Sequence, residues 1–346
     1  MCSPLARESA QRCRVNLKGH AIGVAFYMRT LGRIVLAVLL LGIVLGVTFY
    51  LRPIWFLRQT THFGLFLSRV QSNYVLTPEG RVHYYEAEPR IPGGGTPIVL
   101  IHGLGDRDEA WAPMLKRLKR AGFHVYAPDL LGYGRSPKPL DGDYSISGQT
   151  KFVYDFIQAL GLQKTDVGGW SMGGWIALKL ALDHPDLIDR VVVYDPAGIR
   201  FQLSDPKKLF EPQTTDDVQR LFSIMEPDAK PLPMNVRRDL LREIQAMQWT
   251  IDKNLSSMTE NDLLDTQLPS LSEPLLIVWG ADDHLIPLSV GEKMHQLVPN
   301  SELDILAGCG HLEPNRCSRR AASATADFLK ANPVPSGSVR TLQPMH

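Results

Sequence analysis

The stretch Asp166 to Lys179, DVGGWSMGGWIALK, decides the fold expected for this chain. Residues Gly169 to Gly173 spell G-x-S-x-G, a pattern typical of a sharp turn between a strand and a helix. The serine of such a turn has a strained backbone, so its neighbours two residues either side must be nearly free of side chain. Ser171 is therefore the candidate nucleophile. The apolar run that follows it predicts a helix whose positive end lies beneath developing negative charge.

Length and composition limit the classes of function. The chain has 346 residues, 44% of them apolar, which is enough for one large domain with an insertion or for two modest ones. A net charge of +1, without long runs of like charge, provides no basic field for nucleic acid.

The four cysteines are Cys2, Cys13, Cys309 and Cys317, and their spacing is not that of a zinc site. Cys309 and Cys317 are near enough in sequence to pair in an oxidising compartment, but two free thiols are the simpler expectation.

The N-terminal region predicts a membrane anchor. Residues 1–33 form a basic segment, and residues 34–51 then run without a charge. As a helix rising about 1.5 Å per residue, this run spans roughly 27 Å, close to the thickness of a bilayer core. A cleaved signal peptide and a buried core helix are the alternatives, although no small-x-small cleavage site follows the run. Six basic residues before the run, against Arg52, Arg58 and Arg69 shortly after it, favour a cytoplasmic N-terminus and a catalytic part on the other side. Met28 is an alternative start to Met1, because MRTLGR and the apolar run already form a complete anchor.

Beyond the anchor, the pattern divides into a linker, an alternating core, an insertion and a tail. Residues 52–79 resemble an aromatic interfacial linker. Strand-like and helical runs alternate over 80–197 and 273–332, which predicts a mainly parallel sheet covered on both faces, with function at the carboxyl ends of its strands. Residues 198–272 lack a strand-like run and predict a helical cap, and 333–346 predict a flexible tail. We expect most of the cap's large apolar residues to form its core and some to face the site as acyl-chain contacts: Phe222, Met225, Met234, Met247, Trp249 and Met258.

A serine nucleophile needs a base, and the base needs a carboxylate to orient it. His311 follows a predicted strand in a Gly-flanked loop, in the order serine, acid, histidine that is typical of this class of sheet. Asp283 is the preferred acid because it keeps a G-x-x-D-x-x-x-P spacing; Asp195 is second and Asp282 third.

The tetrahedral intermediate needs two donors for its oxyanion. We expect the backbone N–H of Met172, the residue after the nucleophile, to be one donor. We expect that of Leu104, in the loop after the strand 97–102, to be the other. We expect His102 to be a hydrogen-bonded scaffold residue and Asp129 to bind the amides of the turn that follows it.

Five motifs in one order, IHGLGD, PDLLGYGRS, GGWSMGGWIAL, WGADDHLIP and GCGH, resemble the α/β-hydrolase fold family over roughly residues 80–330. The N-terminal anchor, the DPAGI turn and the CGH loop look most like its membrane-bound monoacylglycerol lipases. That resemblance implies Ser171, Asp283 and His311 as triad and Leu104 and Met172 as oxyanion amides. Relatives commonly carry glutamate and proline where this chain has Arg316 and Ser318, which leaves the start of the last helix open.

The expected function is therefore hydrolysis of a carboxylic ester, of monoacylglycerol or another lipid, by a serine esterase on a membrane. Carbon–carbon hydrolysis of a diketone-type substrate and a non-catalytic, membrane-tethered binding protein are the alternatives. A serine at 171 excludes the halide and epoxide branches, which need an aspartate there. This chemistry calls for no metal and no organic cofactor.

Overall fold

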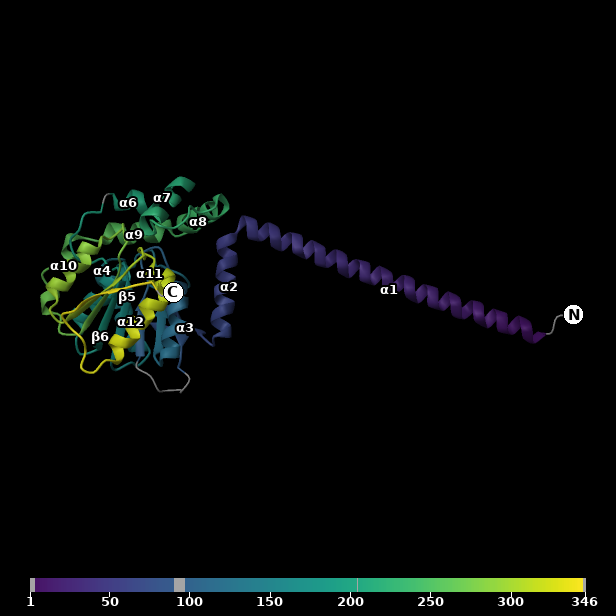
Figure 1. Ribbon diagram of the computed structural model, residues 1–346, viewed down its shortest axis with the longest axis horizontal. Helices are drawn as coiled ribbons and strands as arrows, with labels where there is room; N and C mark the ends of the chain where they lie inside the picture. Colours follow the sequence, from purple (N-terminus) through teal and green to yellow (C-terminus); the bar gives the residue numbers. More distant parts are fainter. Residues whose placement is uncertain (1–3, 90–96, 204, 345–346) are drawn as a thin grey trace. The chain divides into compact units, whose positions relative to one another are not determined.

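The computed structural model describes residues 4–89, 97–203 and 205–344, and of residues 4–26 and 313 it describes the backbone only (Figure 1). The chain divides into two units, Met1–Pro53 and Ile54–His346. The first is one helix, α1 (Pro4–Leu51), within which Tyr27–Leu51 is long and apolar enough to cross a membrane. None of that stretch is buried within the structure, which favours a membrane span over the alternative of a buried core helix. The predicted basic segment lies mostly outside the described side chains.

The second unit is built on a nine-stranded sheet in the order β1-β2-β4-β3-β5-β6-β7-β8-β9. Strands β1 and β2, and β2 and β4, pair antiparallel, and every other pair is parallel, which confirms the mainly parallel sheet. The strands are β1 (Gln71–Thr77), β2 (Gly80–Ala87), β3 (Pro97–Ile101), β4 (His124–Pro128), β5 (Thr165–Trp170), β6 (Ile188–Tyr194), β7 (Leu275–Gly280), β8 (Ser301–Leu306) and β9 (Val339–Leu342).

Helices cover both faces of this sheet because its central strands are apolar on both sides. One face packs against α4 (Ile146–Ala159), α5 (Met172–Asp183) and α10 (Leu288–Leu297). The other packs against α3 (Ala112–Ala121) and α12 (Ser318–Lys330), seen together in Figure 1. The strand side chains alternate between these two cores: Val99, Val167, Val193 and Ile277 point to the first, Leu100, Val192, Tyr194 and Val278 to the second.

Between β6 and β7 the chain forms a helical insertion, defined here as α6 to α9. Its helices are α6 (Pro206–Phe210), α7 (Thr215–Met225), α8 (Met234–Ala246) and α9 (Gln248–Ser257). Thr214 begins α7 with a capping box, its side chain accepting from Asp217 N while Asp217 accepts from the Thr214 N–H.

Two segments differ from what the pattern predicts. The expected linker contains a helix, α2 (Pro53–Leu67), and the antiparallel strand β1. The tail at 333–346 is not simply flexible: β9 adds to the edge of β8, and Arg340 pairs with Glu302 and Asp304 at 2.8 and 2.7 Å. Both strands lie at sheet edges and expose most of their side chains, so they lack the apolar pattern by which the inner strands are recognised.

A disulfide joins Cys309 and Cys317, so the simpler expectation of two free thiols is wrong. The last helical region starts as a short turn, α11 (Glu313–Arg316), followed by α12 from Ser318. This answers the question that the Arg316 and Ser318 departures raised.

Candidate active site

The turn at Ser171 has the geometry that its sequence predicts. Ser171 has φ 56° and ψ −119°, a strained conformation for a residue with a side chain. A Cβ at Gly169 would lie 2.0 Å from the Gly173 oxygen, and one at Gly173 would lie 2.1 Å from the Ile101 oxygen. Only glycine fits at either position, which is why strand β5 can turn directly into α5.

The loops after β6, β7 and β8 bring two carboxylates and an imidazole together. His311 Nδ1 lies 2.7 Å from Asp283 Oδ2, and both side chains are almost fully buried. Asp283 Oδ1 accepts from the N–H groups of Leu285 and Ile286 at 2.8 and 2.9 Å. These bonds fix the carboxylate behind the ring, the place that an orienting acid must occupy.

Asp195, the second choice for the acid, lies in the same cluster. One polar atom each of Asp195, Asp283 and His311 falls within 4.8 Å of the others. Asp195 Oδ1 accepts from Gly280 N at 2.8 Å, so this carboxylate holds β6 to the end of β7. Asp282 donates its N–H to the Cys309 oxygen, and the carboxylate of Asp283 accepts from His311 Nδ1.

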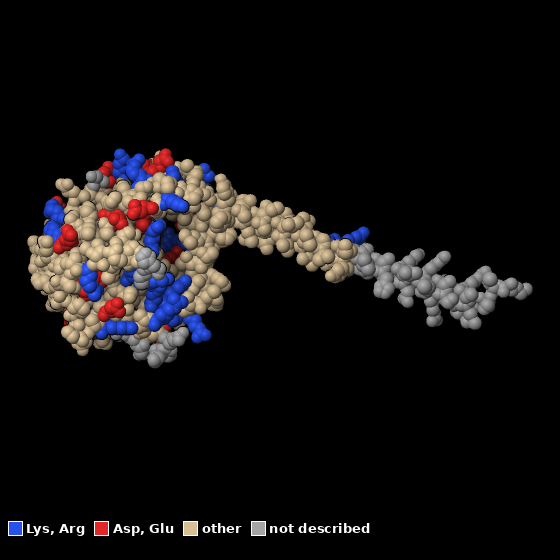
Figure 2. Space-filling model, in the orientation of Figure 1, with Lys and Arg blue, Asp and Glu red and all other residues tan. Residues whose placement is uncertain are grey.

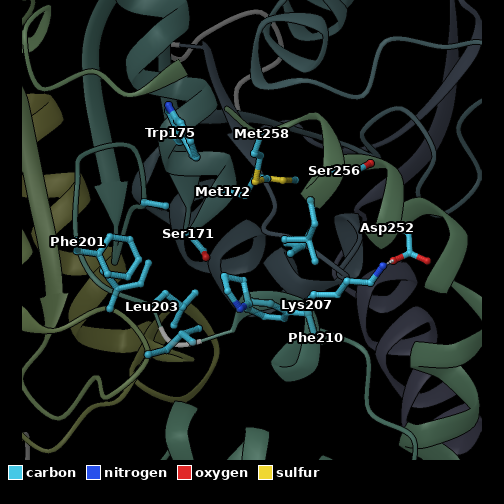
Figure 3. A pocket seen from close by; sticks show the side chains of 16 residues that line it. Ser171, Met172, Trp175, Phe201, Leu203, Lys207, Phe210, Asp252, Ser256 and Met258 are labelled. Atoms are coloured by element: carbon cyan, nitrogen blue, oxygen red, sulfur yellow. Dashed lines mark ion pairs between the residues drawn. The ribbon is translucent and has the colours of Figure 1, made fainter. Parts of the chain in front are cut away.

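The structure places the remaining predicted residues on one pocket or beside it. Leu104, Ser171 and Met172 all line a pocket of about 450 Å³ (Figure 3). Among the hydrogen bonds of the described residues, none uses the backbone N–H of Leu104 or Met172, so both donors are available to an oxyanion. No described hydrogen bond joins the Ser171 hydroxyl to His311; such bonds often tighten only when substrate is present.

His102 and Asp129 take the scaffold positions expected of them. His102 Nε2 accepts from Leu130 N at 3.0 Å, and burial lowers the pKa of this histidine, which keeps it neutral. Asp129 accepts from the N–H groups of Asp108 and Arg135 at 3.0 and 2.8 Å. Both residues therefore hold loops in place.

The pocket itself is mainly apolar. Its floor is Ser171 and the start of α5, and side chains from the helical insertion form its walls (Figure 3). Among the described residues that line it, Lys207 and Asp252 are the only charged ones, and they pair with each other at 3.7 Å. The apolar side chains that line it are Leu104, Met172, Trp175, Ala197, Phe201, Leu203, Pro206, Phe210, Leu255, Met258, Leu285 and Ile286.

Of the apolar residues expected to face the site, Met258 alone lines this pocket. Met234 and Trp249 are 51% and 38% exposed, and Met247 contacts Arg107. A methionine-rich composition marks an apolar helical segment, but it does not say which side of each helix points inward.

The insertion also forms hydrogen bonds with the loop that carries His311, and the sequence analysis did not predict these contacts. His311 N donates to the Met225 oxygen at 2.7 Å, and Leu312 N donates to Glu226 Oε1 at 3.0 Å. Arg316 pairs with the other Glu226 oxygen at 3.0 Å. On the opposite side, Trp170 Nε1 donates to the His311 oxygen at 2.8 Å. Arg316, which stands where relatives commonly carry a glutamate, marked this loop as unusual in the sequence but did not indicate Glu226 as its partner.

We predict that Glu226 positions the loop of His311 through these hydrogen bonds and its ion pair with Arg316. Burial raises the pKa of its carboxyl despite the nearby Arg316 charge. Glu226→Ala leaves the Leu312 N–H unpaired, at a cost of about 1–3 kcal/mol, and we expect kcat to fall by about tenfold or more. Glu226→Gln keeps an acceptor and should lose less. Arg316→Gln is the control, because it keeps the bond from Leu312 to Glu226. A fall in melting temperature without a fall in kcat would contradict this role.

Comparison with known proteins agrees with this architecture. The family model described as "alpha/beta hydrolase fold" matches residues 96–226 and 242–313, so the chain belongs to the α/β hydrolase fold family. It is a hydrolase of that fold.

Particular relatives divide between two chemistries. The chain is 28% identical over 257 residues to 2-hydroxymuconate semialdehyde hydrolase of Pseudomonas putida, covering 71% of this chain and 91% of that one. It is 26% identical over 231 residues to Lipase 3 of a Moraxella species, covering 63% and 72%. Among solved structures it is similar to a bacterial membrane phospholipase A described as a virulence factor, with a TM-score of 0.71 at 25% identity, covering 85% and 97%.

Proposed function

We propose that this protein is a membrane-anchored serine hydrolase that cleaves carboxylic esters of lipids, with monoacylglycerol as the leading substrate. Ser171 Oγ attacks the ester carbonyl while His311 Nε2 takes its proton, and Asp283 stabilises the imidazolium through Nδ1. The N–H groups of Leu104 and Met172 bind the oxyanion. His311 returns the proton to the leaving alcohol, and water then releases the acyl group from Ser171 by the same steps in reverse order.

The observation that carries this proposal is the apolar pocket beside Ser171. An acyl chain buried there gains about 0.8 kcal/mol per methylene and needs no charged partner. The segment between β6 and α6 supplies Phe201 and Leu203 to its wall and α6 supplies Phe210, and we infer that residues 198–272 act as the cap over the site.

The anchor is part of the same proposal. Tyr27–Leu51 would hold the catalytic unit at a bilayer, where its substrates are dissolved, although an N-terminal signal sequence meets the same criteria of length and composition. The basic residues before the span and the Cys309–Cys317 disulfide both favour a catalytic unit outside the cytoplasm. Protease protection in sealed, one-sided vesicles tests this orientation.

Carbon–carbon hydrolysis is the second candidate, because relatives with that activity match the chain. One of them is named as a hydrolase of a heptadienoate, a substrate that carries a carboxylate. A buried carboxylate needs a cation. Lys207 is the one cation among the described lining residues of this pocket, and its side chain is 71% exposed and pairs with Asp252. The lining therefore favours an uncharged lipid ester.

An acyl-length series is expected to separate the two candidates. On detergent-dispersed monoacylglycerols, kcat/KM should rise about three- to fourfold per methylene until the chain fills the pocket, and p-nitrophenyl acetate should be a poor substrate. Phe201→Ala should reduce the preference for long chains, whereas Phe222→Ala, on α7 and outside the lining, should leave it intact. A flat series, or faster turnover of a dienoate followed by its ultraviolet absorbance, would favour the alternative.

A further inference from the structure

A second cavity, remote from Ser171 in the fold, lies at the carboxyl-terminal end of α2. It has a volume of about 670 Å³ and is bounded by α2, β1, Tyr85 of β2 and the turn after β4. Two arginines, Arg69 and Arg135, line it, and none of the described residues around it contributes a carboxylate to the lining. At its edge, Phe66 and Leu67 are 73% and 64% exposed. The cavity thus combines cationic side chains with an apolar rim.

The polar groups of this cavity are held in fixed positions. Arg135 donates from Nη1 to Ser72 Oγ at 3.2 Å and from Nη2 to the Tyr85 hydroxyl at 3.0 Å. A guanidinium has five N–H donors, so three remain after these two bonds among the described residues. Ser72 Oγ also lies 2.8 Å from His83 Nε2. The arginine fork and two hydroxyls therefore face the cavity in a preorganised array.

Behind the cavity, the buried His83, which bonds to Ser72, is itself held by two buried carboxylates. His83 Nδ1 lies 2.6 Å from Asp108 and 3.2 Å from Asp129. Burial opposes the charge of this imidazole, but its bonds to both carboxylates raise its pKa overall. Burial raises the pKa of Asp108 to about 7, whereas burial of Asp129 is outweighed by hydrogen bonds from His83 and from backbone N–H groups, which lower its pKa.

The surroundings are also basic. Lys119 Nζ donates to the Ser68 and Arg69 oxygens, and α3 carries Lys116, Arg117 and Arg120 as well. A Cβ at Gly64 would lie 2.9 Å from Lys116 Nζ, so this basic row adjoins the end of α2. Figure 2 shows Lys and Arg side chains gathered over the region of α3.

Helix α2 turns apolar side chains outward and charged ones inward. Arg58 pairs with Glu109 and with Glu243, which lies on α8, at 3.0 and 2.6 Å. In contrast, Trp55 and Phe63 are 43% and 62% exposed. Because α2 begins two residues after the candidate span ends at Leu51, its outer face is within reach of a bilayer surface.

We propose that this cavity binds the phosphate of an anionic phospholipid headgroup in the membrane that anchors the protein. Arg135 and Arg69 pair with the phosphate oxygens, and the Ser72 and Tyr85 hydroxyls orient them. Phe66 and Leu67 contact the adjoining acyl region. The site depends on the proposed anchor to bring lipid within reach, but not on hydrolysis.

The test uses full-length Ser171→Ala protein in detergent, so that no ester is cleaved. Ether-linked phosphatidylglycerol, ether-linked phosphatidylcholine and inorganic phosphate are added separately, and native mass spectrometry and melting temperature report binding. We expect one tightly retained phosphatidylglycerol per chain and a raised melting temperature. Arg135→Gln should weaken this binding by at least about tenfold.

Arg69→Gln provides a second variant that leaves the fold intact, because this exposed side chain has no ion pair among the described residues. It should also weaken lipid binding. Arg220→Gln, on α7 and outside the cavity, is the matched control and should bind as the parent does. Equal retention of phosphatidylcholine, an equal shift with inorganic phosphate alone, or undiminished binding by both cavity variants would overturn the proposal. Any of these results would leave hydrolysis that depends on Ser171 unaffected.

Discussion

Replacing Ser171 by alanine will lower kcat on lipid esters by at least about 10⁴-fold and abolish labelling by a fluorophosphonate probe. The reason is that Ser171 lies on the strained turn between β5 and α5 and lines the apolar pocket. Rates are measured on a monoacylglycerol, and labelling is followed by gel fluorescence or mass spectrometry.

Ser256→Ala is the matched control, because Ser256 lines the same pocket but lies on α9, away from the turn. It should keep both activity and labelling. Labelling that persists in Ser171→Ala and vanishes in Ser256→Ala would identify Ser256, and not Ser171, as the nucleophile. The absence of labelling in the parent protein would favour a non-catalytic, membrane-tethered binding protein.

The base should be equally indispensable. His311→Ala is expected to cost about as much as Ser171→Ala, and the double variant little more, because the two residues act in one step. His284 offers a control: it is exposed in the loop that follows β7, one residue after Asp283. Additive losses from the serine and histidine variants would contradict a shared role.

Asp283→Asn is expected to lower kcat by up to about 10⁴-fold while leaving the fold intact, since an amide would stabilise the wrong tautomer of His311. Asp195→Asn should lower kcat by less than about tenfold. The Asp195 carboxylate accepts from Gly280 N, so weakening this bond should appear mainly as lower stability.

Kinetics and melting temperature measured on both variants separate the two acids. The Asp195 and Asp283 carboxylates lie in one cluster with His311, so the size of each kinetic effect is what distinguishes the orienting acid from its neighbour. A larger kinetic effect for Asp195→Asn would assign the acid to the loop after β6, the second choice from sequence.

Much of the fold could be predicted because the inner strands are buried on both faces. Strands β5 and β7 are buried at every residue and consist mostly of apolar residues and glycine, and helical segments separate the strands, so the alternation was visible without coordinates. The edge strands β1 and β9 escaped this reasoning. One face or both of an edge strand meets solvent, and its pairing depends on a neighbour distant in sequence.

The candidate site divides in the same way. Ser171, Asp283 and His311 could be proposed from local spacing, because a sharp turn and a strand end impose demands on the residues beside them. Glu226 could not, since its carboxylate meets Leu312 and Arg316 only after the insertion folds over the last loop. The pairing of Cys309 with Cys317 was left open for a related reason: sequence distance permits a bond but does not say how the two side chains point.

By itself, then, the sequence determined the class of fold, the sharp turn at Ser171, the candidate span at the N-terminus and the order in which serine, acid and histidine follow one another. These are local properties, imposed on neighbouring residues by backbone geometry and by burial. Only the tertiary structure decided which carboxylate bonds to His311, which side chains line the pocket, and that Arg69, Ser72, Tyr85 and Arg135 meet in a second cavity. Such contacts join segments far apart in the chain, and their geometry is set by packing rather than by any periodic pattern.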